Sequence, residues 1–490
     1  MMELPFDVLH EIALYFDLSA SLADCALDLS YEAEYRQLRS VSLVSKAWRE
    51  AAVPLLRRIF WDTGLFRHRL HFLRQCVKRP GSVAEIRAVH VSSKWIVPWT
   101  GLLPCPIVSK AARAISSDKE WLLSFRTSIF TDGPLMNPMD VPDYSSANMA
   151  LIVASLPRLQ TIQLCVILGE APVGLLRRRV ILLLFQFAYT NPSLLKSLTS
   201  VSVMCDDLRH NGHAKGIDAI LSLTTIKRFA MQGSWREGSA EDLSVYSPRV
   251  GLPRGSKVDR LILSSWAGQK HLLNRLVCFC ERLRVFELRL DMEQMSQHPY
   301  PEAKDLLEGI VSVLVEHQRR LEQLTLNVGV FHQQKGASSG INPIGSLTKL
   351  TSLRSLDVSA ELFVGRPGTP HKYDYSGKAL AIKTKDLELA HLSNLAMYVL
   401  DNDTTGVQSE FPATIKALMI GPIQEAGLVG QKTWNVLVDV FPDQLDSLVL
   451  RVPEAQGQSG EFAKMWMAYF MAGKDGRLPG LSELRVEKLS

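Results

Sequence analysis

Apolar positions in the first sixty residues follow the spacing of short amphipathic helices. Two stretches place apolar residues three or four positions apart, one at residues 8–12 and the other at residues 38–48. Pro5 precedes the first stretch, where the missing N–H of a proline costs nothing, and Asp7 adds negative charge that suits the start of a helix. Two short helices cannot bury such faces alone in water, so they need a partner, either the rest of the chain or another protein.

A second pattern begins near residue 80, where a phrase of the form Leu-x-x-Leu-x-Leu recurs along the chain. The last three positions of the phrase alternate apolar and polar, which is typical of a strand with one buried face. Clear copies start at residues 159, 198, 283, 321, 353, 445 and 481, and weaker matches surround Val89, Phe229, Leu261, Leu395 and Leu418. Helix-like stretches lie between copies, at residues 272–277, at 306–314 after Pro301, and at 462–470.

A strand followed by a helix, repeated along the chain, is the unit of a leucine-rich-repeat solenoid. The copies are about 32 residues apart on average, which is longer than the ~20–29 residues of a standard repeat, and the gaps are irregular. We therefore expect an α/β fold in which parallel strands form an irregular solenoid with helices on its convex side. An α/β sheet of another topology is the alternative, although a doubly wound sheet would contain near-continuous apolar strands instead of alternating ones.

The two N-terminal stretches also carry a recognisable motif. Residues 4–12 read LPFDVLHEI and residues 38–49 read LRSVSLVSKAWR. Together they resemble an F-box, the module that docks onto the Skp adaptor of SCF-type ubiquitin ligases, and residues 53–60 resemble the segment that leads into the repeats of many fungal F-box proteins. By position, the resemblance implies that the adaptor-binding residues are Leu4, Pro5, Val8, Leu9, Ile12, Leu43, Val44 and Trp48.

The chain departs from the F-box pattern in one respect. Ile12 and Val44 are roughly fifteen residues further apart than the family usually has, and the extra segment, at about residues 19–36, is acidic. This segment either loops out between the helices, which leaves the docking geometry intact, or reshapes the second helix, which favours the capping role. The expected domains are an F-box-like helical domain at 1–62 and a degenerate leucine-rich-repeat domain at 63–490, interrupted by a Pro-, Ser- and Gly-rich insertion at about 100–148.

Composition narrows the functional classes. Of the 490 residues, 47% are hydrophobic and 21% are charged, which is typical of a folded globular protein. The net charge of +5 is small, and the lysines and arginines are scattered along the chain. This distribution gives little support for nucleic-acid binding. An odd number of cysteines (seven) without repeated CxxC spacing, and no apparent signal peptide or membrane-length apolar run, indicate a cytoplasmic or nuclear protein.

Sequence motifs for catalysis or metal binding are missing. Neither a phosphate-binding loop nor a zinc-protease or hydrolase motif occurs. One cluster of ligand types, Cys205, Asp206, Asp207, His210 and His213, is interrupted by the turn-forming pair Asn211-Gly212, so we expect no metal there. The chain is therefore expected to need no cofactor and to be no enzyme. A site in the 100–148 insertion would be the alternative, but its carboxylates have no histidine beside them.

Binding remains as the expected function. Polar positions between the apolar ones of each strand would line the concave surface, and a mixture of polar residues and arginines suits a protein partner. A simply solvated face is the alternative for any one residue. The candidate substrate-binding residues are Arg228, Arg260, Glu287, Arg289, Gln323, Asn327, Asp357, Arg451 and Arg485.

Two functional hypotheses follow. In the first, the chain is the non-catalytic substrate receptor of an SCF-type ubiquitin ligase: the F-box holds the Skp adaptor, and through it a cullin-RING ligase, while the repeats hold a protein target at high effective concentration. In the second, the chain is a leucine-rich-repeat scaffold, and its F-box-like helices only cap the end of the solenoid.

Overall fold

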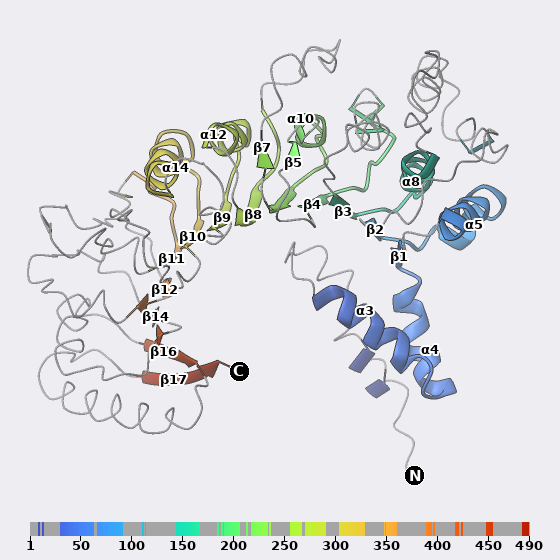
Figure 1. Cartoon of the computed structure of the whole chain (residues 1–490), viewed down its shortest axis with the longest axis horizontal. Coiled ribbons are helices and arrows are strands. Elements are labelled where there is room, and N and C mark those ends of the chain that lie inside the picture. Colours follow the sequence, from blue (N-terminus) through green and yellow to red (C-terminus); the bar gives the residue numbers. More distant parts are fainter. Residues whose placement is uncertain are drawn as a thin grey trace, which may run out of the picture. The chain divides into compact units, whose positions relative to one another are not determined.

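The fold is described here from a computed structural model of the whole chain (Figure 1). The described residues are 8–9, 12–13, 30–62, 66–91, 110–111, 113, 144–166, 184–185, 188–189, 191–205, 212–213, 217–233, 235–236, 255–266, 270–290, 303–328, 347, 349–359, 389–393, 395–396, 417–420, 423–424, 447–453 and 483–489. The chain divides into two compact units, Met1–Val258 and Asp259–Ser490, and each is described by itself.

Unit 1 begins with helices and continues as a parallel sheet. Each strand pairs in parallel with the next one in the order β1-β2-β3-β4-β6, so every turn of the chain adds one strand at the edge. Its elements are α3 (Ser30–Val41), α4 (Lys46–Leu56), β1 (Ile59–Trp61), α5 (Phe66–Lys78), η1 (Pro80–Val83), β2 (Ala88–Val91), α8 (Tyr144–Ala154), β3 (Thr161–Val166), β4 (Ser200–Cys205), β5 (Gly212–His213), α10 (Ile217–Leu221), β6 (Arg228–Gln232) and β7 (Trp235–Arg236).

Unit 2 repeats this arrangement over a longer run of strands. All its neighbouring strands pair in parallel, in the order β8-β9-β10-β11-β12-β14-β16-β17, with the short pair β13-β15 beside them. The elements are β8 (Arg260–Trp266), α12 (Lys270–Phe279), β9 (Val285–Leu290), α14 (Ala303–His317), β10 (Gln323–Val328), β11 (Ser355–Ser359), β12 (Leu389–Ser393), β13 (Leu395–Ala396), β14 (Ala417–Ile420), β15 (Ile423–Gln424), β16 (Ser447–Pro453) and β17 (Glu483–Leu489).

Each unit is thus an α/β solenoid, as the repeated phrase predicts. Every clear copy of the phrase that starts between residues 159 and 481 contains a strand, and so do the weaker matches at Val89, Phe229, Leu261 and Leu418. In β9 and β10 the phrase leucines are fully buried, whereas the intervening positions lie on the opposite face of the strand. Figure 1 shows α12 and α14 on one side of the strands β8–β10, and none of the described helices of unit 2 lies on the other side of these strands.

Some segments differ from the expectation. Residues 30–36, which belong to the acidic insert, form the first turns of α3, so this part of the insert extends the second helix instead of looping out. Strand β1, at residues 59–61, pairs with β2 and so already belongs to the sheet. The helix expected around 462–470, and most of the insertion expected at 100–148, lie outside the described residues, although α8 already begins at Tyr144.

A buried ion pair fixes the first turn of the solenoid. Asp62 follows β1 and Arg69 lies in α5, and neither side chain is exposed to solvent. Arg69 donates from Nε at 2.8 Å and from Nη2 at 2.5 Å to the two carboxylate oxygens of Asp62. Replacing one partner would leave a buried charge without its counterion, so this pair ties α5 firmly to β1.

Buried polar side chains also link one turn to the next. The amide of Gln318, which follows α14, donates to the carbonyl oxygens of Val277 at 2.8 Å and Cys280 at 3.1 Å, at the end of α12. In unit 1 the hydroxyl of Ser256 likewise donates to the carbonyl of Leu221, at the end of α10. These contacts satisfy carbonyls that a helix end leaves without an intrahelical partner.

We predict that Gln318→Leu destabilises the end of α12 by about 1–3 kcal/mol, because the Val277 and Cys280 carbonyls each lose one of two donors and keep only a backbone N–H. Hydrogen exchange of the full chain, read at residues 274–280, should accelerate accordingly. Arg319→Leu, at the exposed neighbouring position, is the control and should leave the exchange unchanged. Equal exchange in Gln318→Leu and the unaltered chain would contradict this role.

Candidate functional site

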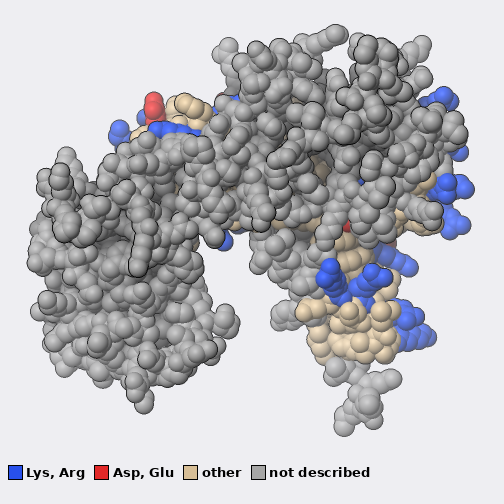
Figure 2. Space-filling view, viewed as in Figure 1, with Lys and Arg blue, Asp and Glu red and all other residues tan. Residues whose placement is uncertain are grey.

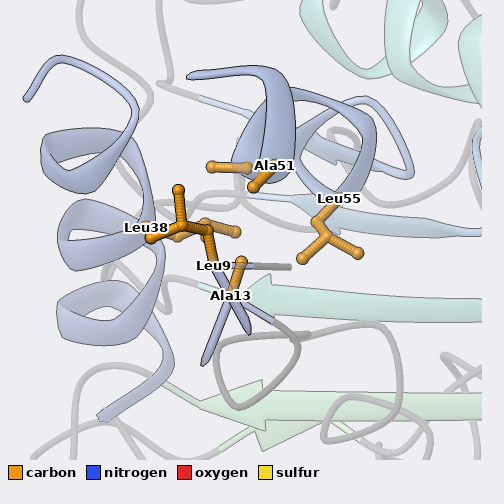
Figure 3. Packing of buried hydrophobic residues seen from close by; sticks show 6 residues of the cluster. Leu9, Ala13, Leu38, Ala51 and Leu55 are labelled. Carbon is orange, nitrogen blue, oxygen red and sulfur yellow. The ribbon is translucent and has the colours of Figure 1, made fainter. Parts of the chain in front are cut away.

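The N-terminal helices pack into a small apolar cluster. Leu9 and Ala13, in the helical residues before α3, meet Leu38 of α3 and Ala51 and Leu55 of α4 (Figure 3). All five side chains are buried, with exposed fractions of 3% or less. Of the two apolar stripes, Leu9 and Leu38 are therefore buried by mutual packing of three helical segments.

A tightly bonded turn joins α3 to α4. The N–H groups of Ser42, Leu43 and Val44 donate to the carbonyls of Leu38, Ser40 and Val41, and the Ser42 hydroxyl donates to the carbonyl of Arg39. The next helix is then capped by Ser45, whose hydroxyl accepts the N–H of Trp48 at 3.2 Å. These bonds fix the backbone of the turn at both ends.

This turn presents two large apolar side chains to solvent. Leu43 and Val44 are each 70% exposed, and Val8 is 42% exposed. Among the described side chains, these three are the large hydrophobic ones that stand out as exposed, and all three belong to the predicted adaptor-binding set. Exposed apolar side chains held by a rigid backbone are typical of an interaction surface.

The other predicted adaptor-binding residues have different positions. Leu9 lies inside the helical cluster, and Trp48 is half-buried and packs against it. Ile12 is partly exposed, while Leu4 and Pro5 lie outside the described residues. Leu9 and Trp48 therefore hold the helices together, whereas Val8, Leu43 and Val44 are available to a partner.

The two helices that flank this turn carry several exposed cations. Figure 2 shows Lys and Arg side chains gathered over α3 and α4. The exposed cations are Arg36, Arg39, Lys46, Arg49 and Arg57, whereas Glu50, which faces Lys46 at 3.9 Å, is the exposed carboxylate among the described side chains of these two helices. Such a surface favours a partner with negative charge around an apolar patch.

A ladder of stacked side chains connects α3 to the sheet of unit 1. Tyr35 of α3 stacks on Trp61 of β1 with ring centroids 4.9 Å apart, and Trp61 stacks on His90 of β2 at 4.0 Å. His90 Nδ1 lies 2.7 Å from the side-chain oxygen of Gln163 in β3, which is buried. Burial also raises the pKa of the Tyr35 hydroxyl. The first helices thus cover the first strand.

In unit 2 the helix-free face of the strands carries most of the predicted substrate-binding residues. Glu287 of β9 is buried and accepts from Arg260 of β8 at 2.9 Å, while Arg289 lies 3.5 Å from its other oxygen. Arg289 is 59% exposed, and Asn327 pairs with it in register on β10. Four of the predicted residues therefore come together on three adjacent strands.

The remaining predicted residues are more dispersed. Gln323 and Asp357 are partly exposed on β10 and β11 of unit 2, and Arg228 is partly exposed on β6 of unit 1. Arg451 and Arg485 lie on β16 and β17, where the backbone register pairs Arg451 with Glu487. Glu287 differs most from the expectation of an exposed binding residue, since its carboxylate is held between two arginines.

A second charged row lies just before the strands. Arg284 donates from two nitrogens to Glu322, at 2.9 and 2.8 Å, and both side chains are largely exposed. The hydrogen bond from Arg284, and the charges of Arg284 and Arg354, hold the pKa of Glu322 below its ordinary value. Arg284 and Glu322 thus pair with each other within the protein. The sequence pattern did not single them out, because both residues precede the alternating part of the Leu-x-x-Leu-x-Leu phrase.

A metal site and a reactive cysteine each have requirements that can be checked among the described residues. No group of three or more potential ligands comes together there, and His210 lies outside the described residues. Burial raises the pKa of Cys76 and of Cys280 to about 12, and it raises the pKa of Cys278 with help from the charge of Glu316. These thiols are poor nucleophiles at neutral pH. No helix in the described part is long and apolar enough to cross a membrane.

Comparisons with known proteins leave the family open. No protein-family model matches the sequence, and no curated protein matches it. Among solved structures, the crystal structure of an internalin (inlF) from Listeria monocytogenes is similar over 77% of this chain and 92% of that chain, with 12% identity and a TM-score of 0.19. A TM-score this low adds nothing to the fold, which rests on the parallel strand register and the buried repeat leucines.

We predict that Cys278 alkylates slowly at pH 8 and that Glu316→Gln speeds the reaction. A raised pKa keeps the thiol protonated, and removing the neighbouring negative charge lowers that pKa and increases the thiolate fraction. Mass spectrometry of the iodoacetamide-treated chain measures the rate, with buried Cys280 as an unreactive internal control. An unchanged Cys278 rate in Glu316→Gln would show that this charge does not act on the thiol.

Proposed function

We propose that this protein is a non-catalytic substrate receptor of an SCF-type ubiquitin ligase. The observation that carries the proposal is the rigid turn at residues 42–45, which exposes Leu43 and Val44 within a segment that resembles an F-box. A Skp-type adaptor binds this surface, and the solenoid binds a protein target. The mechanism is proximity: one chain holds target and ligase together, so ubiquitin transfer occurs at high effective concentration.

The energetics suit a docking surface. Fully burying a leucine or valine side chain contributes about 1.5–3 kcal/mol, so Leu43 and Val44 together offer several kcal/mol that the free protein does not use. The hydrogen bonds of the turn hold both side chains in place before binding, which lowers the entropy that docking must overcome. Exposed Arg39, Lys46 and Arg49 lie near them in the chain and favour an adaptor with an acidic rim.

We predict that Leu43→Asp combined with Val44→Asp abolishes capture of a recombinant Skp-type adaptor, with a loss of about 3 kcal/mol or more in binding free energy. Because both side chains are exposed, the thermal unfolding temperature of the full chain should hardly change. Gln37→Asp, an exposed position on α3, is the matched control for added charge and should retain capture. Full capture by the double variant would refute the docking role.

The alternative role, in which these helices only cap the solenoid, also has an observation in its favour. Tyr35 packs against Ile59, Ala88 and Trp61, and so covers the strands at the start of the sheet. A cap shields apolar groups that the terminal turn of a solenoid would otherwise expose. Capping and docking use different residues of the same helices, so each can be tested separately.

We predict that Tyr35→Ala lowers the stability of the first turns by about 1–3 kcal/mol, because the stack on Trp61 and the buried ring contacts are lost. Tyr35→Phe keeps the ring and should stay close to the unaltered chain. Hydrogen exchange at β1 and β2 reports the effect. Should Tyr35→Ala leave exchange there unchanged, the capping role would be excluded, whatever the adaptor experiment gives.

A further inference from the structure

On the face of strands β8–β10 that lies opposite α12 and α14, two described arginines share one described carboxylate. Arg260 and Arg289 both contact the carboxylate of Glu287, at 2.9 and 3.5 Å. Glu287 is buried, with 9% of its side chain exposed, so it cannot turn away to solvent. Counted over these three described side chains, two guanidinium groups and one carboxylate carry one net positive charge.

Arg289 carries this surplus charge. Its side chain is 59% exposed, and the contact with Glu287 uses only one end of its guanidinium group. A guanidinium has five N–H donors arranged as a planar fork, so most of the donors of Arg289 face solvent. The pinned end limits its rotation, which lowers the entropy lost when a ligand binds to the free end.

The backbone beside Arg289 is irregular. The register between β8 and β9 shifts between Leu263 and Trp266, so Ser264 and Ser265 together lie opposite Arg289. Ser265 has a φ of 46°, in the left-handed region that a serine rarely adopts. On the other side, Asn327 of β10 pairs with Arg289 in register. Such a bulge costs about 1–3 kcal/mol of strain and commonly lies next to a binding site.

A neighbouring arginine shows what a neutralised position looks like. Arg284 precedes β9 and donates from Nε and Nη2 to the two carboxylate oxygens of Glu322, so one carboxylate matches its one positive charge. It is as exposed as Arg289, with 58% of its side chain accessible. The two arginines are therefore equally exposed but differently paired. Arg284 forms two hydrogen bonds to its own carboxylate, whereas Arg289 shares a carboxylate with Arg260.

We propose that Arg289 binds an anionic side chain of an extended segment of the protein target, lying across β8, β9 and β10. The anion is a carboxylate or a phosphate, because both present oxygen pairs that match the guanidinium fork. In the strand register, Asn327 of β10 and Ser264 and Ser265 of β8 lie beside Arg289. The inference rests on target binding by the solenoid and makes no use of the adaptor-binding turn.

The test measures fluorescence polarisation of labelled peptide pools with the full chain at low salt. The pools have degenerate flanks and one fixed central residue: glutamate, phosphoserine, serine or lysine. We expect the two anionic pools to bind more tightly than the serine pool, and the lysine pool to bind least. The ratio of the two anionic pools identifies the preferred anion. In Arg289→Gln, affinity for the preferred pool should fall about tenfold.

Arg284→Gln is the matched control, since it removes the same charge from an equally exposed arginine. The affinity of Arg284→Gln for the preferred peptide pool should stay within about twofold of that of the unaltered chain. Four pools that bind alike or not at all, an unchanged affinity in Arg289→Gln, or an equal loss in Arg284→Gln would overturn the proposal. Capture of the Skp-type adaptor by Arg289→Gln is measured in parallel: intact capture with lost peptide binding separates this site from the docking role.

Discussion

The structure depends on the burial of the repeat leucines between parallel strands and helices. A single strand–helix turn cannot hide its apolar face from water, so each turn is stable only when the next turn covers it. In β9 and β10, Leu288 and Leu326 are fully buried in this way, and the strands pair residue by residue in the same register. Because these apolar positions are fixed inside, the alternate positions of β9 and β10 form the opposite face, where Glu287, Arg289, Gln323 and Asn327 lie.

The N-terminal helices also bury apolar side chains at the start of the sheet, but they leave two apolar side chains exposed. Their inner side chains, such as Leu9 and Leu38, satisfy one another, and Tyr35 covers the first strand. Leu43 and Val44 are not needed for either purpose, yet a capped and hydrogen-bonded turn holds them in solvent. A fold under selection for stability alone gains nothing from this exposure, which is why we assign it to a partner.

Local patterns in the sequence predict much of this architecture and little of its electrostatics. The alternation in the phrase at Leu283–Leu288 predicts β9 because side-chain period is a local property. Strand β1 and the helical start of α3 were missed, since Tyr35 and Trp61 acquire their role only by stacking on each other across the fold. The pairs Asp62–Arg69 and Arg260–Glu287 were also invisible, because their partners meet through strand pairing and helix packing. For the same reason, the sequence does not reveal that Arg284 has its own carboxylate partner in Glu322, whereas Arg289 shares Glu287 with Arg260.

The most direct test of the central claim is hydrogen exchange of the full chain with and without a recombinant Skp-type adaptor. Docking through the exposed turn predicts slower exchange at residues 40–48 in the complex, while the strands β8–β10 exchange at the same rate in both samples. Identical exchange at residues 40–48 with a saturating amount of adaptor would contradict the assignment of this protein as a ligase receptor.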